Sequence, residues 1–251
     1  MTDETSRDTR TLRRMDLRLR VERFAGGPLG QGVAGSRSQS YDHCYNYFTP
    51  TRQPTADLEK SCAVLGFYLA SWGMYRGSTY LFKNTSSEHF IPLVGFIDQQ
   101  GLLLRGIDLN GYDTEHIEVL VETYGRVRDL VLPARHTALT LVTKIMAGVF
   151  GCVPAFDTYF VKGIRSVFSG RDGRAFGSFS PQSLRLLNAL YLDNQQVVDT
   201  LAQESATVAF PGGAPGGLPL TRAKVIDMYG FELGYRPSPP DSPGAQPTSA
   251  S

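Results

Sequence analysis

The chain has 251 residues, of which 41% are hydrophobic and 20% are charged. This composition is that of an ordinary globular protein, so a chain that is disordered throughout is excluded. The 25 lysines and arginines against 24 acidic residues leave a formal net charge of +1, so any affinity for nucleic acid or a membrane must come from a local patch.

The three cysteines, Cys44, Cys62 and Cys152, are widely spaced and include no CxxC pair. This pattern indicates neither a disulfide framework nor a cysteine-based zinc site, and we expect buried free thiols. The first 24 residues lack the apolar core of a secretion signal, so we predict a cytoplasmic location. No metal or cofactor is predicted, because no histidine pair at ligand spacing and no common nucleotide-binding motif occurs.

Residues 1–36 combine charged residues with the glycine-rich run AGGPLGQGVAGS and show no long apolar face of helical period. We expect them to form a disordered tail that the folded body does not need. The arginines of this tail are candidates for contact with an anionic surface, although the acidic residues between them favour a solvated segment.

The first predicted helix starts at Ser38, and its apolar residues recur at the spacing of one helical stripe: Tyr41, Cys44, Tyr45 and Phe48. Residues 56–75 follow. Their uncharged core, SCAVLGFYLASWGMY, has 15 residues, which is too few to span a bilayer, so no membrane association is predicted. Because this segment is apolar on all faces, we expect it to be the central buried helix.

Two of these segments, together with a later one, carry a resemblance. The strings YDHCYNYF, SCAVLGFYLASWGMYRGSTYLF and TKIMAGVFGCVPAFDTYF resemble a group of small bacterial helical proteins whose function is uncharacterised. The resemblance extends over about half of the chain. It implies a helical fold and brings no activity with it.

The remaining elements are also helical. Residues 86–111 predict a short helix followed by a loop or a short extended piece, and 113–132 predict a helix with acids in its first turn and arginines near its end. Ser180 and Pro181 start a long helix that runs to about residue 205. A linker at 211–219 and a last helix at 221–234 follow.

These elements predict an all-α fold. We expect one globular helical domain of about eight helices over residues 37–236, with disordered tails at 1–36 and 237–251.

The most sharply punctuated stretch is 132–174. An apolar helix pattern stops at Gly151, Pro154 bars its continuation, and Asp157 stands where the N-cap of the next helix belongs. As a cap, Asp157 accepts hydrogen bonds from the first amides of that helix. Asparagine caps about as well as aspartate, so this interpretation predicts that Asp157→Asn leaves stability nearly unchanged.

Basic residues follow Asp157. Four of them lie in residues 159–174 against the single acid Asp172, a local excess of +3, and they are candidates for phosphate contacts: Lys162, Arg165, Arg171 and Arg174. DNA or RNA is therefore a candidate partner.

The string AGVFGCVPAFDTYFVKGI is similar to a segment of helix-hairpin-helix DNA glycosylases. In that segment a helix ends at Phe-Gly, a loop follows, and an Asp-Thr-aromatic motif opens the next helix. The resemblance implies that Asp157 is a catalytic carboxylate, which stabilises the cationic sugar as a flipped base departs or helps to activate the nucleophile.

The sequence departs from that family in the preceding hairpin. The family has a Leu-Pro-Gly-x-Gly turn, whose backbone amides hold a phosphate, and some members carry a lysine nucleophile there. This chain has LPARHTA, with Ala134, Arg135 and His136 in place of the glycines. Glycine permits the close backbone approach of such a turn, so here Arg135 and His136 are the candidates for holding phosphate, through their side chains.

Three classes of function stay open at this stage. The chain is a base-excision enzyme that uses Asp157, a nucleic-acid binder without catalysis, or a helical interaction module in which Asp157 is only a helix cap. The sequence does not indicate the oligomeric state.

Overall fold

The computed structural model describes residues 16–25, 39–133, 136, 138–168, 170–210 and 217–235. Within these ranges the fold is all-α, as predicted, with twelve α-helices and no strands. A lone β-bridge joins Ala206 and Pro219. The predicted tail at 237–251 lies outside the described residues. In the described part of the chain, no helix is both long and apolar enough to cross a membrane.

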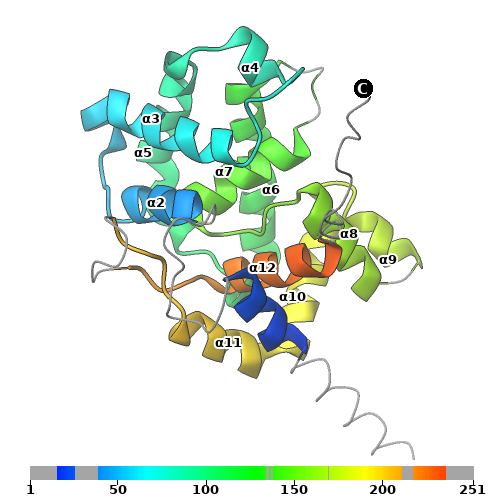
Figure 1. Cartoon of the computed structure of the whole chain (residues 1–251). Coiled ribbons are helices and arrows are strands. Elements are labelled where there is room, and N and C mark those ends of the chain that lie inside the picture. Colours follow the sequence, from blue (N-terminus) through cyan, green and yellow to red (C-terminus); the bar gives the residue numbers. More distant parts are fainter. Residues whose placement is uncertain are drawn as a thin grey trace, which may run out of the picture.

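The upper half of the molecule in Figure 1 holds the helices from α2 to α7. Its α-helices are α2 (Gln39–Phe48), α3 (Leu58–Ser71), α4 (Tyr80–Asn84), α5 (Ile91–Arg105), α6 (Thr114–Val131) and α7 (Leu139–Phe150). Three short 3-10 helices connect them, η1 (Pro54–Asp57), η2 (Ser87–Phe90) and η3 (Leu109–Gly111). Helix α7 lies in the middle and contacts α2, α3, α5 and α6. Every residue of α7 from Leu141 to Phe150 is buried.

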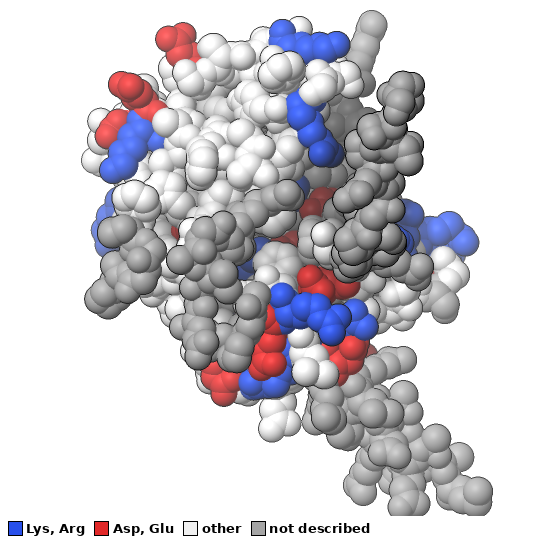
Figure 2. Space-filling view, in the orientation of Figure 1, with Lys and Arg blue, Asp and Glu red and all other residues white. Residues whose placement is uncertain are grey.

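The central buried helix is therefore α7, and the prediction that gave this place to residues 56–75 was wrong. Helix α3 packs one side against α2, α5 and α7 and leaves the other in water, where Phe67 is 60% exposed. Figure 2 shows that the surface over α3 is largely free of charged side chains. Apolar residues on every face permit burial without requiring it, because much of any protein surface is apolar.

The lower half holds the helical residues 16–24 and the C-terminal helices. These are α8 (Thr158–Val167), α9 (Gly170–Ala175), α10 (Pro181–Asp193), α11 (Gln195–Glu204) and α12 (Arg222–Gly234). The long helix predicted from Ser180 is two helices, because the backbone at Asn194 leaves the helical conformation. The short helix α4 matches a helix predicted at residues 79–83, whereas α9 and the helix at residues 16–24 were not predicted. With the break at Asn194, these two helices explain why the described residues contain more helices than the eight predicted.

Residues 16–25 also differ from the prediction, which placed them in a disordered tail at 1–36. They form a helix whose Leu17 and Val21 are buried, and Arg18 pairs with Glu204 of α11 at 2.9 Å. The ring of Phe24 lies 5.4 Å from that of Phe231 in α12. So short an apolar stripe among many charges is a weak sequence signal, and docking on the body, rather than intrinsic propensity, stabilises such a helix.

Asp108 joins the two halves. It precedes η3 in the upper half, and its carboxylate accepts hydrogen bonds from the backbone amides of Arg222 and Ala223, both at 2.9 Å, at the start of α12. The Arg222 guanidinium pairs in turn with Asp199 of α11 at 2.6 Å. A carboxylate at a helix N-terminus satisfies free amides and interacts favourably with the helix dipole.

Helices α8 and α12 pack with their backbones in contact. Glycines stand where they meet, Gly163 in α8 and Gly230 and Gly234 in α12. A Cβ atom on Gly163 would collide with the carbonyl oxygen of Gly230, and one on Gly234 would collide with that of Tyr159. Only glycine allows this approach, and the approach sets the start of α8 against α12.

This packing makes Gly163→Ala destabilising. We expect the free energy of unfolding to fall by about 1 to 3 kcal/mol or more, because the added methyl group forces the two backbones apart. Gly125→Ala is the matched control, since Gly125 is also inside a helix but has open space around its Cβ position. Alanine there should stabilise the protein by roughly 0.5 to 1 kcal/mol. Urea unfolding measures both changes, and equal effects would contradict the close packing.

Candidate functional site

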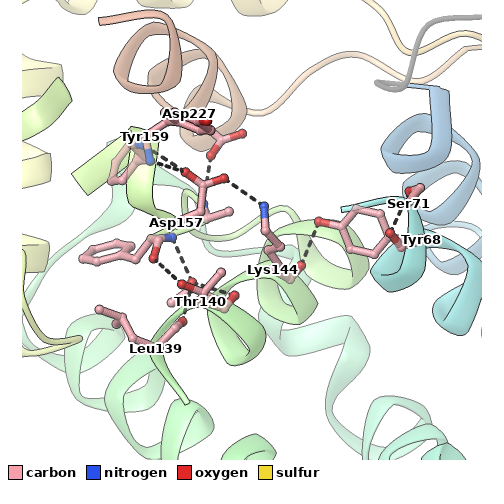
Figure 3. Close-up of polar contacts among 12 residues, drawn as sticks. Tyr68, Ser71, Leu139, Thr140, Lys144, Asp157, Tyr159 and Asp227 are labelled. Atoms are coloured by element: carbon pink, nitrogen blue, oxygen red, sulfur yellow. Dashed lines mark hydrogen bonds and ion pairs between the residues drawn. The ribbon is translucent and has the colours of Figure 1, made fainter. Parts of the chain in front are cut away.

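Asp157 caps the N-terminus of α8, as the sequence predicts. Its Oδ1 accepts hydrogen bonds from the backbone amides of Tyr159 at 3.0 Å and Phe160 at 2.9 Å. The sequence did not reveal what holds the other oxygen. Oδ2 accepts a hydrogen bond from the ammonium of Lys144 in α7, with 3.0 Å between Nζ and Oδ2. The carboxylate is thus fixed by two amides and by one opposite charge (Figure 3).

The loop between α7 and α8 is held from both sides. Helix α7 ends at Gly151, which has the left-handed backbone conformation with φ 68°. The amide of Phe156 donates to Thr143 Oγ1 at 2.8 Å, and Thr140 Oγ1 donates to the carbonyl of Phe156 at 3.1 Å. From the other side, the amide of Ala155 donates to Asp227 Oδ1 of α12 at 2.9 Å. Asp157 therefore projects from an anchored loop (Figure 3).

Asp227 belongs to a second lysine–aspartate pair. Its Oδ2 lies 2.8 Å from Nζ of Lys224, one turn earlier in α12. Both pairs are nearly buried: the exposed fractions of the side chains are 5% for Lys144, 13% for Asp157, 8% for Lys224 and 11% for Asp227. The two pairs line one recess between the upper and lower halves. Figure 2 shows acidic and basic atoms in the hollow between the halves on this face.

Aromatic rings form the walls of this recess: Phe24, Tyr41, Tyr68, Trp72 and Phe231. Lys144 Nζ lies 4.6 Å from the centroid of the Trp72 ring, and Lys224 Nζ lies 4.1 Å from that of Tyr41, both within the range of a cation–π interaction. Burial raises the pKa of the Tyr41 and Tyr68 hydroxyls well above the usual value, so both stay uncharged. Lysines and aspartates are therefore the charged groups that line this recess.

The recess is small. The free space between its side chains is about 10 Å³, close to the least that holds one water molecule. A nucleobase does not fit into it unless a wall moves. The lower half contributes two uncharged residues to the wall of the recess, Phe24 in the helix at 16–24 and Phe231 in α12.

Two buried ion pairs are a poor way to stabilise a fold. Each charge loses its hydration, and replacing such pairs by apolar residues of similar volume is often neutral or stabilising. Charged groups that converge in a recess with aromatic walls are the usual composition of a ligand or catalytic site. The pairs therefore mark this recess as the candidate functional site.

Asp42 of α2 adds a third carboxylate near Lys224. Burial raises the pKa of Asp42 to about 6, and the hydrogen bond from the Val208 amide and the charge of Lys224 offset only part of that effect. The Asp42 carboxyl group therefore gains or loses its proton near pH 6, which is within the pH range of ordinary assays.

None of the other predicted site residues that the structure describes lines the recess with Asp157. Arg135 is outside the described residues. His136 is exposed, and its ring lies 4.8 Å from that of Tyr80. The four basic residues of α8 and α9 are all exposed: Lys162, Arg165, Arg171 and Arg174. Arg165 Nε donates a hydrogen bond to the carbonyl of Gly173 at 3.2 Å. Arg165 follows Asp157 by eight residues, so it stands about 12 Å further along the helix axis.

Other candidate chemistries find little support. The three cysteines are free and buried, as predicted, and burial raises the pKa of the Cys44 and Cys152 thiols far above the usual value, which makes them poor nucleophiles. Within the described residues, no group of three or more histidine, cysteine, aspartate or glutamate side chains is placed to hold a metal ion.

Comparison with known proteins adds no assignment: no protein family, no curated protein and no solved structure matches the chain. The function is therefore argued from the geometry of the recess.

The pairing of Asp157 with Lys144 changes the stability expected of Asp157→Asn. Asparagine keeps the cap but leaves a buried ammonium without its carboxylate, so the free energy of unfolding should fall by about 3 to 5 kcal/mol. The double variant Lys144→Met with Asp157→Asn should recover most of this loss. Asp113→Asn is the control, because Asp113 caps α6 in the same way while exposed. If urea unfolding shows the same small loss of stability in Asp157→Asn and Asp113→Asn, Lys144 and Asp157 do not stabilise each other.

Asp42 gives a prediction about pH. The folded chain holds the Asp42 proton more tightly than the unfolded chain, whose aspartates titrate near pH 4. The contribution of this group to stability therefore falls, by roughly 3 kcal/mol, as pH rises from about 4 to about 6. Asp42→Asn should raise the melting temperature at pH 7.5 and have little effect at pH 4. Calorimetric melting of both proteins across this range tests it, and an equal shift at both pH values would contradict the raised pKa.

Proposed function

We propose that this protein acts on nucleic acid and that Asp157, with Lys144 beside it, forms a DNA-glycosylase-like site. The observation that supports the proposal is the buried contact between Lys144 Nζ and Asp157 Oδ2, at a helix entrance and in an aromatic recess. The resemblance of the AGVFGCVPAFDTYFVKGI segment to helix-hairpin-helix DNA glycosylases supports the same residue.

The carboxylate suits the chemistry of base release. When a base leaves its sugar, positive charge develops at C1′, and a fixed negative group next to that carbon stabilises it. Asp157 is held in place before the reaction by two amides and an ammonium, so little reorganisation accompanies charge development.

Lys144 supplies a second group. After its proton passes to Asp157, the neutral amine can attack C1′ while the bond from C1′ to the base breaks, and the departing base takes the proton from Asp157, which regains its charge. Transfer of an amine proton to O4′ then opens the sugar ring and leaves a Schiff base between Lys144 and C1′. The hairpin of this chain has no lysine, and Lys144 reaches Asp157 from α7 instead. The exposed cations of α8 and α9 are suited to phosphates some nucleotides away from the reacting sugar.

The size of the recess favours a second candidate, a nucleic-acid binder without catalysis. Space for one water molecule does not admit a base, so the glycosylase proposal requires that the wall formed by Phe24 and Phe231 moves when substrate binds. The binder proposal requires no such movement.

Base release distinguishes the two candidates. Wild type, Asp157→Asn and Asp113→Asn would be incubated with single-stranded and duplex DNA carrying deaminated, oxidised or alkylated bases, at temperatures where circular dichroism shows each protein folded. We expect abasic sites with wild type and with Asp113→Asn, and a rate at least about a hundredfold lower with Asp157→Asn. Abasic sites from none of the proteins on any substrate would end the catalytic proposal in favour of binding.

Borohydride trapping tests the part assigned to Lys144. Reduction during turnover should link wild type covalently to its DNA, and Lys144→Met should give no link. If wild type releases bases but is not trapped, Lys144 only positions Asp157, and water is the nucleophile.

A further inference from the structure

A continuous group of aromatic rings adjoins the recess, and three of its members also line it. Phe231 is its centre, with ring centroids 5.1 Å from Tyr159, 5.4 Å from Phe24, 5.5 Å from Tyr235 and 6.3 Å from Trp72. Tyr159 and Tyr235 also contact each other at 5.3 Å. These five residues are called the aromatic rim below.

The rim is partly open to solvent. Tyr159 and Tyr235 are each 41% exposed, and the other three rings are partly buried. Exposed aromatic side chains that form one contiguous group differ from apolar residues scattered singly over a surface, because such groups mark binding surfaces. The exposure of the rim therefore indicates a binding surface, whereas a single exposed residue such as Phe67 needs no such explanation.

The fold assembles the rim from distant parts of the chain. Phe24 comes from the helix at 16–24, Trp72 follows α3, and Tyr159 lies in the first turn of α8. The glycine contact between α8 and α12 brings Tyr159 against Phe231 and Tyr235, because a larger residue at Gly234 would push α12 away from the Tyr159 backbone.

The rim adjoins the candidate catalytic pair directly. The amide of Tyr159 is bound by Asp157, and the Trp72 ring lies under the ammonium of Lys144. Phe24, Trp72 and Phe231 belong both to the rim and to the walls of the recess. Whatever lies on the rim is therefore next to Asp157.

Positive charge accompanies the exposed rings. Lys162 and Arg165 follow Tyr159 on α8 and are exposed, and Arg171 and Arg174 extend the positive charge over α9. Proteins that bind single-stranded nucleic acid combine these two features, a basic track for the backbone and aromatic rings on which bases stack. In a duplex, neighbouring base pairs already cover the base faces, so exposed rings gain little from it.

We propose that the aromatic rim is a stacking platform for unpaired bases, so that the nucleic acid accepted by this site is single-stranded. The inference rests on the proposed function and narrows it, because it names the form of the substrate. Exposed Tyr159 and Tyr235 receive the bases, and the cations of α8 and α9 contact the phosphates. A base held on the rim is adjacent to the recess before any wall moves.

Trp72 provides the measurement, because it is the only tryptophan of the chain and is part of the rim. The full chain would be titrated with a single-stranded oligodeoxynucleotide, with the duplex of the same sequence and with an abasic strand of equal length, while tryptophan fluorescence is recorded across a salt series. We expect quenching and the tightest binding with the single strand, and weaker binding with the duplex and with the abasic strand.

Variants test the rim residues. Tyr159→Ala and Tyr235→Ala should each weaken single-strand binding by roughly 5- to 100-fold, the range that corresponds to the loss of one stacked base. Phe67→Ala is the control, because Phe67 is an exposed aromatic residue on α3 outside the rim. This variant should bind the single strand as tightly as wild type does. Tyr159→Leu keeps an apolar side chain while removing the flat ring, and should bind weakly even if an alanine variant unfolds.

Several results would overturn the inference. Equal affinity for the abasic strand and the normal strand would show that bases do not stack, and wild-type affinity in Tyr159→Leu would exclude this ring. A wild-type dimer in sedimentation that the rim variants abolish would identify the rim as a surface for a second copy of the chain. If binding depends on the rim but no base is released, this inference stands and the glycosylase proposal falls. If bases are released at the same rate by wild type and the rim variants, the glycosylase proposal stands and this inference falls.

Discussion

Helices α8 and α12 meet backbone to backbone through Gly163, Gly230 and Gly234, and the site is built around this contact. It sets the start of α8, where Asp157 lies, against the helix that carries Lys224 and Asp227. It also allows Asp227 to bind the loop amide of Ala155. Side chains larger than hydrogen at these positions would separate the two helices and, with them, the groups that line the recess.

The recess contains buried charged groups, which protein cores usually lack. Two ammoniums and two carboxylates are removed from water there, and Asp42 remains close to Lys224 although burial disfavours its charged form. Such an arrangement contributes little to stability compared with apolar packing. Natural proteins usually break the rules of core packing at functional sites. The geometry of the recess thus gives a physical reason for the functional proposal, independent of any resemblance.

The sequence predicted the features that depend on local pattern. The all-α class follows from periodic apolar residues, and the cap at Asp157 follows from the glycine and proline before it, so both are confirmed. The features that depend on distant contacts were missed. Lys144 is the one charged residue of α7, which is visible in the sequence, but nothing local shows that its ammonium meets Asp157. The helix at 16–24 was missed because its binding surface belongs to α11 and α12.

The walls of the recess come from nearly opposite ends of the described chain, Phe24 on one side and Lys224 with Asp227 on the other. During synthesis a ribosome makes the first of these early and the others late, since translation proceeds from the N-terminus. Until α12 has emerged, Asp157 lacks the loop anchor that Asp227 gives, and Tyr159 has no Phe231 to pack against. A nascent or prematurely ended chain therefore holds Lys144 and Asp157 without the site around them. Emergence of α12 is the event that completes the site.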